Sequence, residues 1–285
     1  MELHDAEIAI KSSFPNFSTE GLHSLGGQTT WTFATSEHVF RFARTTKIAR
    51  LLENERLLLA KLVDELPVEI PRTVVIGEWS SLPCSSYQII NGKPLHPELL
   101  FGSEGTRLAQ QLGELLDSLH LKTPANSVSE KVPTGTIETI DREIFSRLPL
   151  PIRFAAGYAI RKASTLLTLK NPTLIHSNLK FRHLLTRSNK IVGLTGLTKA
   201  RVGDVAQDFS AIFAEVGWKG MDDVLRFYKE PLGEKFEERV EFFYWTAPLH
   251  DINYAILANN EPALGLARTE LSQRMIKVGI MPNYN

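Results

Sequence analysis

Apolar residues follow two rhythms along the chain, and the change between them separates a β-rich part from a helical part. A short helix is predicted for Asp5–Lys11. Residues 22–44 then carry three short apolar pieces, HSLGG, TTWTFAT and HVFRFAR, with the alternation typical of strands. Over Thr46–Leu62 apolar residues recur at helical spacing behind a threonine N-cap. Two more strands are predicted at Thr73–Gly77 and Ser86–Ile90. The first part should therefore be a small sheet with one long helix.

The second part of the chain is mostly helical. The segment Asn91–Pro94 contains glycine and proline, which break regular structure, so it is predicted to link two lobes. After it come predicted helices and one strand-rich island, in the order 108–121, 137–148, 152–169, 173–202 (the island) and 208–277. We predict an α+β protein with a β-rich N-terminal lobe (1–90), a hinge (91–95) and a helical C-terminal lobe (96–285).

The composition adds few constraints. The chain has 285 residues, 43% of them hydrophobic, which is enough for a sizeable core. With 32 basic and 32 acidic residues, no overall field attracts it to nucleic acid or to anionic lipid. The N-terminus, MELHDAEIAI, lacks the positive residues of a signal peptide, and no apolar run reaches the roughly 18 residues of a membrane span. Cys84 is the single cysteine, so no internal disulfide forms. We expect a cytoplasmic protein with no nucleic-acid or membrane partner.

Glu55 is the first residue that indicates chemistry. It falls on the apolar stripe of its helix, between Leu52 and Leu58, and a carboxylate that points inward is costly unless it is paired. The nearest basic residue in a predicted strand is Arg41. A strand cation paired with a helix carboxylate is how kinases position the group that contacts the α- and β-phosphates. The alternative is a glutamate at the edge of the stripe that reaches water.

Gly26 and Gly27 lie between two predicted strands. A glycine pair lets backbone N–H groups approach phosphate oxygens closely. It also suits an ordinary hairpin turn, so the pair alone leaves both interpretations open.

The segment LIHSNLKFRHLL, residues 174–185, carries the strongest signal. Kinases share a catalytic loop of the form H-R-D-L-K-x-x-N, followed by a hairpin that ends in a metal-binding aspartate. His176 and Lys180 match this loop. Asn178 occupies the position of the catalytic base, and His183 that of the metal-binding asparagine. Downstream, in GLTGL, Gly196 occupies the position of the metal-binding aspartate.

These motifs, in this order, resemble the aminoglycoside phosphotransferase family. Further pieces join the resemblance: GGQTTWTF resembles the family's nucleotide loop, VFRF its third strand, ENERLLLAKL its αC helix, YQIINGKPL its hinge, and VGDVAQDF the segment after the metal-binding residue. The matches extend from about residue 22 to 215. The resemblance implies a bilobal protein-kinase-like fold, ATP or GTP as cofactor, and a hydroxyl-bearing small molecule as acceptor. It also implies nucleotide contacts at six positions: Gly26, Gly27, Arg41, Glu55, Gln88 and Ile90.

Two substitutions separate this chain from an active member of that family. Asn178 has the shape of aspartate but no basic oxygen near neutral pH, and general-base assistance is worth roughly 10²–10⁴ in rate. Gly196 offers no side-chain ligand, and His183 offers nitrogen where Mg²⁺ prefers oxygen, so the residues argue against a well-held Mg²⁺. Asp204 and Asp208 are retained, and in the family the latter braces the catalytic loop.

We interpret this pattern as an inactive or very slow pseudo-phosphotransferase (a pseudokinase) that binds a small molecule, a nucleotide or a partner protein. Two alternatives stay open: an active kinase with a displaced metal ligand or a metal-independent route, and a structural subunit of a complex. Elsewhere, His120 is interpreted as a cap at the end of its helix. The acidic residues between Asp222 and Asp251 are interpreted as a solvated helix face, although in the family such groups receive cationic aminoglycosides.

Overall fold

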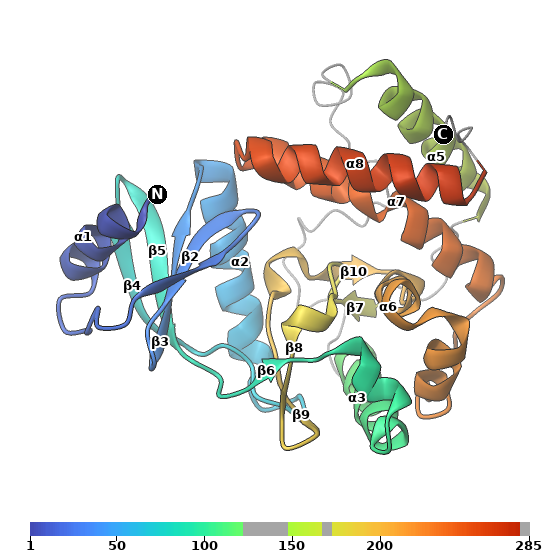
Figure 1. The fold of residues 1–285 in the computed structure, drawn as a ribbon, viewed down its shortest axis with the longest axis horizontal. Coiled ribbons are helices and arrows are strands. Elements are labelled where there is room, and N and C mark those ends of the chain that lie inside the picture. Colours follow the sequence, from blue (N-terminus) through green and yellow to red (C-terminus); the bar gives the residue numbers. More distant parts are fainter. Residues whose placement is uncertain (122–147, 167–172, 280–285) are drawn as a thin grey trace.

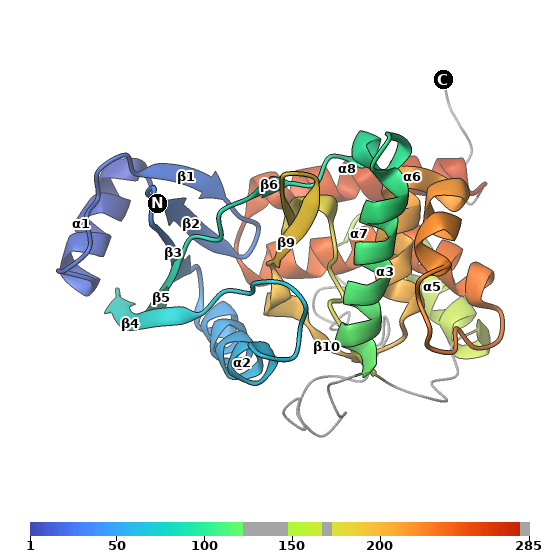
Figure 2. The same cartoon turned by 90° about the horizontal axis from the view of Figure 1, so that it is seen from below.

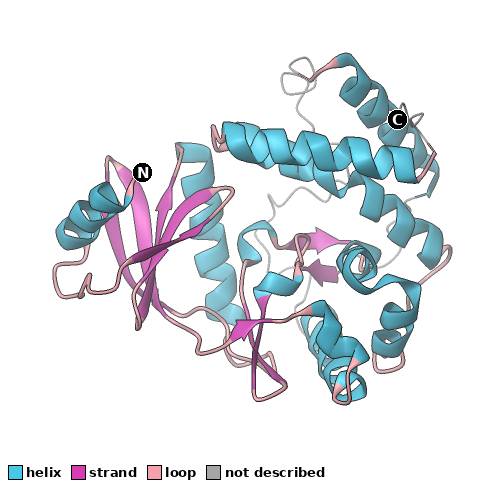
Figure 3. Cartoon of the chain, viewed as in Figure 1, coloured by secondary structure: helices cyan, strands magenta, loops and turns pink. Residues whose placement is uncertain are grey.

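The computed structural model describes residues 1–121, 148–166 and 173–279, which form two lobes (Figure 1). Strands are concentrated in the N-terminal lobe and helices in the C-terminal lobe (Figure 3). The elements of the N-terminal lobe are α1 (Leu3–Ser13), β1 (His23–Gly26), β2 (Thr30–Ala34), β3 (His38–Ala43), α2 (Thr46–Leu62), β4 (Thr73–Trp79) and β5 (Leu82–Gln88). Most of the helix predicted for 137–148 lies outside the described residues.

The strands of this lobe pair antiparallel in the order β1-β2-β3-β5-β4. Successive side chains of a strand point to opposite faces. Phe40 and Phe42 therefore share one face, where they pack with Phe14 of α1, whereas Arg41 lies on the other face, toward α2. The predicted alternation of β3 is confirmed, and it places the only cation of that strand between sheet and helix.

The helix α2 begins and ends where the sequence predicts. The Thr45 hydroxyl accepts a hydrogen bond from the backbone N–H of Ile48, which is the N-cap geometry. Its apolar stripe is buried, from Ile48 to Leu62, and Glu55 is buried within it at 3% exposure. The inward position of Glu55 is thus confirmed, and the alternative in which it reaches water is wrong.

The predicted linker is more regular than its sequence suggests. Lys93–Pro94 forms a short strand, β6, that pairs with β8 (Leu184–Arg187) of the C-terminal lobe. The Lys93 carbonyl accepts a hydrogen bond from the Thr186 hydroxyl. Proline lacks an N–H, but an edge strand tolerates it. The hinge is therefore attached to the C-terminal lobe.

The C-terminal lobe begins with a 3₁₀ turn and continues with helices around a small β region. Its elements are η1 (Pro97–Phe101), α3 (Gly105–Leu121), α5 (Leu150–Leu166), β7 (Thr173–Ile175), η3 (Phe181–His183), β8 (Leu184–Arg187), β9 (Lys190–Leu194), η4 (Leu197–Lys199), β10 (Arg201–Gly203), α6 (Ala206–Leu225), α7 (Phe236–Leu257) and α8 (Glu261–Lys277). The helix α3 lies beside β9 and α6 (Figure 2). Among the described helices, none is long and apolar enough to cross a membrane.

Candidate functional site

The catalytic loop, residues 176–180, follows β7 and is held by a buried carboxylate. Asp208 on α6 accepts hydrogen bonds from the backbone N–H groups of His176 (2.7 Å) and Ser177 (2.8 Å). Ser177 has a positive φ of 60°, a conformation that costs energy for a residue with a side chain, and these bonds stabilise it. The loop thus keeps the scaffold that the resemblance implies for Asp208.

His120 contributes to the same brace, which corrects the interpretation of this residue as a helix cap. Its ring is buried, contacts the Asp208 carboxylate through Nε2 (3.2 Å) and contacts the Tyr228 hydroxyl through Nδ1 (2.8 Å). A side chain at a helix end caps carbonyl groups only where it stays near them. Here α3 turns the ring into the core between α3 and α6.

Gly196 adopts a left-handed backbone conformation with φ +81°. A Cβ atom placed there would lie 2.9 Å from Nε2 and Cδ2 of the His183 ring. Heavy atoms this close clash, so the His183 ring fills the space that a side chain at position 196 would need. The two positions that bind metal in the family are therefore in contact, and neither supplies a carboxylate.

The His183 ring is fixed by its surroundings. It stacks on His176 with ring centroids 5.3 Å apart, and the His176 Nε2 lies 2.8 Å from the Thr195 carbonyl. Burial lowers the pKa of His183 well below its ordinary value, and the neighbouring His176, Arg182 and Lys180 lower it further. The ring is therefore neutral near pH 7. Within the described residues, no group of three or more histidine, cysteine, aspartate or glutamate side chains is arranged to hold a metal ion.

Arg41 and Glu55 form the predicted ion pair. Nη1 of Arg41 lies 2.6 Å from Oε2 of Glu55, with both side chains largely buried. A third residue, Thr198 of η4, closes the cluster: its hydroxyl accepts from Arg41 Nη2 (2.7 Å) and donates to Glu55 Oε2 (2.8 Å). The strand cation, the helix carboxylate and the segment after Gly196 are therefore joined across the lobes.

The glycine pair lies at the end of β1: Gly26 is the last residue of the strand, just after a register shift, and Gly27 begins the loop to β2. Both residues have positive φ, and a Cβ at Gly27 would lie 2.5 Å from the Thr30 carbonyl oxygen. The loop contacts α8: the side-chain amide of Asn260 donates to the carbonyl of Gln28 (2.8 Å) and, at 3.4 Å, to that of Gly27. The loop is therefore bound to the C-terminal lobe as well as to its own sheet.

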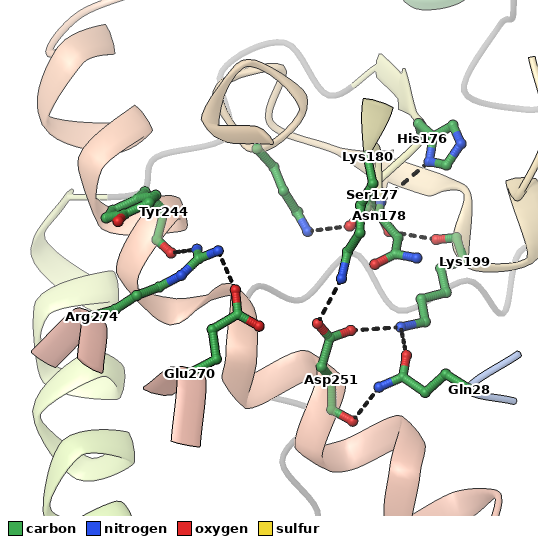
Figure 4. Close-up of polar contacts among 11 residues, drawn as sticks. Gln28, His176, Ser177, Asn178, Lys180, Lys199, Tyr244, Asp251, Glu270 and Arg274 are labelled. Carbon is green, nitrogen blue, oxygen red and sulfur yellow. Dashed lines mark hydrogen bonds and ion pairs between the residues drawn. The ribbon is translucent and has the colours of Figure 1, made fainter. Parts of the chain in front are cut away.

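A lysine pair meets one carboxylate beside the catalytic loop (Figure 4). Lys180 Nζ lies 3.2 Å from Oδ2 of Asp251, and Lys199 Nζ lies 3.1 Å from Oδ1. Lys199 also donates to the side chain of Gln28 at 3.1 Å and lies 4.0 Å from the centre of the Tyr254 ring. Burial alone would raise the pKa of the Asp251 carboxyl, but Lys199 and Lys180 hold it below its ordinary value. Asp251 is therefore ionised and shared by two cations.

Asp251 corrects the interpretation of the acidic segment. Most carboxylates between Asp222 and Glu241 are exposed, as predicted, but Asp251 is 8% exposed. It lies on α7 between the buried residues Leu249 and Ile252, the same situation that singles out Glu55 on α2. The signal was therefore present in the sequence. Lys199 carried a weaker one, as a cation three residues after Gly196.

A cavity of about 890 Å³ lies between the lobes, and we call it the inter-lobe cavity. Among the predicted site residues, it brings together Gly26, Gly27, Arg41, Asn178, Lys180, His183 and Gly196. Glu55 does not line it but contacts two residues that do, Arg41 and Thr198. His176 is buried and stacks on His183. Gln88 and Ile90 are not among its lining residues. Tyr87 lines it instead, because β5 alternates and Tyr87 shares a face with Ser85, the partner of Arg41 in the sheet.

Solved structures that resemble this chain include aminoglycoside and macrolide phosphotransferases. The GDP complex of wild-type aminoglycoside 2'-phosphotransferase-IIIa superposes with a TM-score of 0.78 at 22% sequence identity, over 97% of this chain and 99% of that one. The GDP and kanamycin complex of APH(2")-IIia gives 0.77 at 22% identity, over 97% and 99%. The macrolide 2'-phosphotransferase MphH from Brachybacterium faecium gives 0.67 at 17% identity, over 94% and 98%.

No protein-family model and no curated protein sequence matches the chain. The likeness to these solved structures nevertheless extends over nearly the whole chain. The chain therefore has the two-lobed, kinase-like fold of the aminoglycoside and macrolide phosphotransferases, which confirms the predicted fold class and supports the resemblance that the motifs indicate.

Proposed function

We propose that the chain is a phosphotransferase-like protein that binds the phosphate groups of a nucleotide between its lobes and is catalytically inactive or very slow. The observation that carries the proposal is the contact between Gly196 and His183. A left-handed backbone and an occupying ring leave no room for the carboxylate that bridges Mg²⁺ to the phosphates in metal-dependent kinases. Asn178 adds to this, because its amide offers no basic oxygen to an acceptor hydroxyl.

The charge of the inter-lobe cavity supports nucleotide binding without a metal. Solved structures with this fold include complexes with GDP, ADP and ATP. In this chain the cavity is lined by five cationic side chains and two carboxylates: Arg41, Arg44, Lys180, Arg182 and Lys199 against Asp251 and Glu270. Fixed ammonium and guanidinium groups bind phosphate oxygens by charge-assisted hydrogen bonds. Its volume lies within the roughly 300–1,000 Å³ of small-molecule sites, and Tyr87 with Pro71 offers apolar surface to a base.

Calorimetry with ATP and with GTP, each with and without Mg²⁺, tests the proposal. We expect binding of at least one nucleotide, with an affinity that changes less than about tenfold, or 1.4 kcal/mol, when Mg²⁺ is added. Arg44→Gln should weaken it, because Arg44 lines the cavity and contacts the Gly27 carbonyl. The matched control is Lys47→Gln, an exposed cation close in sequence that does not line the cavity.

Turnover is measured on the same samples, as ATP hydrolysis, since that readout needs no acceptor. Rates on the kinase scale of roughly 1–100 s⁻¹ would contradict the inactive assignment. A gain in affinity well above tenfold with Mg²⁺ would contradict the metal-independent one.

A second candidate is a slow, active kinase with a rearranged site, and Asp251 favours it. This carboxylate lines the same cavity as Asn178 and is held by two lysines, so it is an ionised group that could orient an acceptor hydroxyl in place of the missing aspartate. Slow turnover that disappears in Asp251→Asn, with nucleotide affinity retained, would favour this candidate over the inactive one.

A further inference from the structure

A second cavity, of about 300 Å³, lies on the other side of the catalytic loop, against α6, α7 and α8. We call it the helix-side cavity. Six residues line both cavities: Asn178, Lys180, Arg182, Lys199, Asp251 and Glu270. The two cavities therefore adjoin each other at the catalytic loop and the lysine pair. A small molecule in the helix-side cavity would therefore lie next to Lys180 and Lys199, the part of the inter-lobe cavity where the proposed function puts the nucleotide phosphates.

The helix-side cavity is cationic. Its lining contains five basic side chains and three carboxylates: Lys180, Arg182, Lys199, Arg201 and Arg274 against Glu215, Asp251 and Glu270. In the lining, basic side chains therefore outnumber carboxylates by two, and the Asp208 carboxylate, outside the lining, also acts on Arg201. A site that receives a polycation such as an aminoglycoside would need the opposite excess.

The carboxylates are already committed. Asp251 is shared by Lys180 and Lys199, and Glu270 pairs with Arg274 of the same helix (Figure 4). Glu215 is exposed, at the rim. No carboxylate of the cavity is therefore left to receive an incoming cation in its interior.

Burial makes the positive charge effective. The side chain of Lys199 is 6% exposed and that of Asp251 11%, so water screens this pair little. The pKa of the neighbouring His250 is affected by the same burial and the same cations. Burial, with Arg201 and Lys199 beside it, lowers the pKa of His250 to about 3, so its ring is neutral. Its Nε2 is buried and has no hydrogen-bond partner within the part of the chain that the structure describes.

We propose that the helix-side cavity binds a small organic oxyanion, carrying a carboxylate or a phosphate ester, and that it excludes polycationic aminoglycosides. An oxyanion supplies acceptors to Lys180, Lys199 and Arg201 and offsets the excess of charge. The polar groups of Ser177 and Ser210 face the remainder of such a molecule. This inference extends the proposed function, since it names the class of small molecule that lies beside the nucleotide phosphates.

The test is calorimetry on the full chain at constant ionic strength with four probes: inorganic phosphate, ribose 5-phosphate, succinate and kanamycin. We expect at least one oxyanion to bind and kanamycin not to bind. The ratio of the ribose 5-phosphate and succinate affinities then assigns the head group. Saturable kanamycin binding, or no binding of any oxyanion, would overturn the inference.

Variants locate the bound anion. Arg201→Gln, which alters the helix-side cavity alone, should weaken the oxyanion by about tenfold or more, the size expected for a lost bond to a charged group. Arg44→Gln, which alters the inter-lobe cavity alone, should leave that affinity unchanged. Glu215→Gln should tighten binding by up to a few-fold, as expected for one exposed charge. A loss caused by misfolding cannot produce this gain, and Lys180→Gln gives a second loss that does not depend on the buried Arg201.

The two proposals fail separately. Nucleotide binding without oxyanion binding would remove this inference and leave the proposed function in place. Oxyanion binding without nucleotide binding would do the reverse. Oxyanion binding that responds to Arg44→Gln and not to Arg201→Gln would place the anion between the lobes, which also overturns the helix-side assignment.

Discussion

Lys180 and Lys199 place two ammonium groups where the two cavities adjoin, one on each oxygen of Asp251. Metal-dependent kinases use a divalent cation at the phosphates, coordinated by carboxylates of the catalytic loop and of the following hairpin. Here both carboxylates are absent, and lysine charge lies in the same region. A lysine is a point charge that needs no ligand set of its own, so under the proposed function the lysine pair would stabilise phosphate charge without coordinating a metal.

The contact between Gly196 and His183 gives a prediction for single residues. Gly196→Ala should destabilise the protein by more than Gly21→Ala, as measured by urea unfolding. Both glycines have positive φ, +81° and +69°, and a left-handed residue with a side chain costs roughly 1–2 kcal/mol. Gly21 has nothing within 4 Å of its Cβ position, so Gly21→Ala reports the backbone alone.

His183→Ala provides the second control. In that background the ring is gone, and Gly196→Ala should cost no more than Gly21→Ala. If Gly196→Ala and Gly21→Ala lower the free energy of unfolding equally in the natural protein, the His183 ring moves aside at little cost. If the excess is found, restoring aspartate at 178 and 196 cannot rebuild a metal site unless His183 is shortened as well.

At the scale of elements, local pattern predicts more than tertiary contact does. The helix α2 follows from its stripe and its threonine cap, and the pair of Arg41 with Glu55 follows from one inward carboxylate and one strand cation. The same reasoning applied to α7 would have found Asp251. By contrast, the register of β5 against β3, which turns Tyr87 rather than Gln88 toward the inter-lobe cavity, follows from the pairing of the two strands and not from the local pattern.

The contact of α8 with the glycine loop joins residues more than 230 positions apart, so no local pattern indicates it. Asn260 caps α8, because its side chain accepts from the backbone N–H of Ala263, and its amide also donates to the loop. Asn260→Asp keeps the acceptor and removes the donor, whereas Asn260→Ala removes both. Hydrogen exchange of the loop amides, residues 26–30, should therefore be faster in both variants.

Stability separates the two roles of Asn260. Asn260→Ala should lower the free energy of unfolding by roughly 0.5–2 kcal/mol, because the helix cap is lost, and Asn260→Asp should lower it by less. If hydrogen exchange of the loop amides is unchanged in Asn260→Asp, the side-chain amide of Asn260 does not hold the loop in place.

Across the whole molecule, polar contacts join the lobes at several places besides the chain itself. Glu69 exchanges two backbone hydrogen bonds with Val192 and Leu194 on the hinge side, both 2.9 Å long. The Thr45 hydroxyl donates to the Leu257 carbonyl, and Gln28 donates to the Asp251 carbonyl, both at 2.9 Å. The lobes are therefore held together around the cavity, and opening it breaks bonds on more than one side.

Histidines whose rings stay neutral in the folded protein give the whole molecule a pH dependence. The pKa values of His176, His183 and His250 are all lowered, in each case chiefly by burial. Below about pH 6.5 the unfolded chain binds protons at these positions and the folded protein does not, so the free energy of unfolding should fall as pH drops from 7 to 5. For His250, with a pKa of about 3, the loss in the free energy of unfolding at pH 5 is roughly 2 kcal/mol.

The lowered pKa of Asp251 acts in another pH window, because its contribution to the free energy of unfolding is lost only below about pH 4. Urea unfolding at pH 7, 6 and 5 measures the slope, and His250→Gln should flatten it by about one proton. A free energy of unfolding that stays constant from pH 7 to 5 would contradict the assignment of these three histidine rings as neutral in the folded protein.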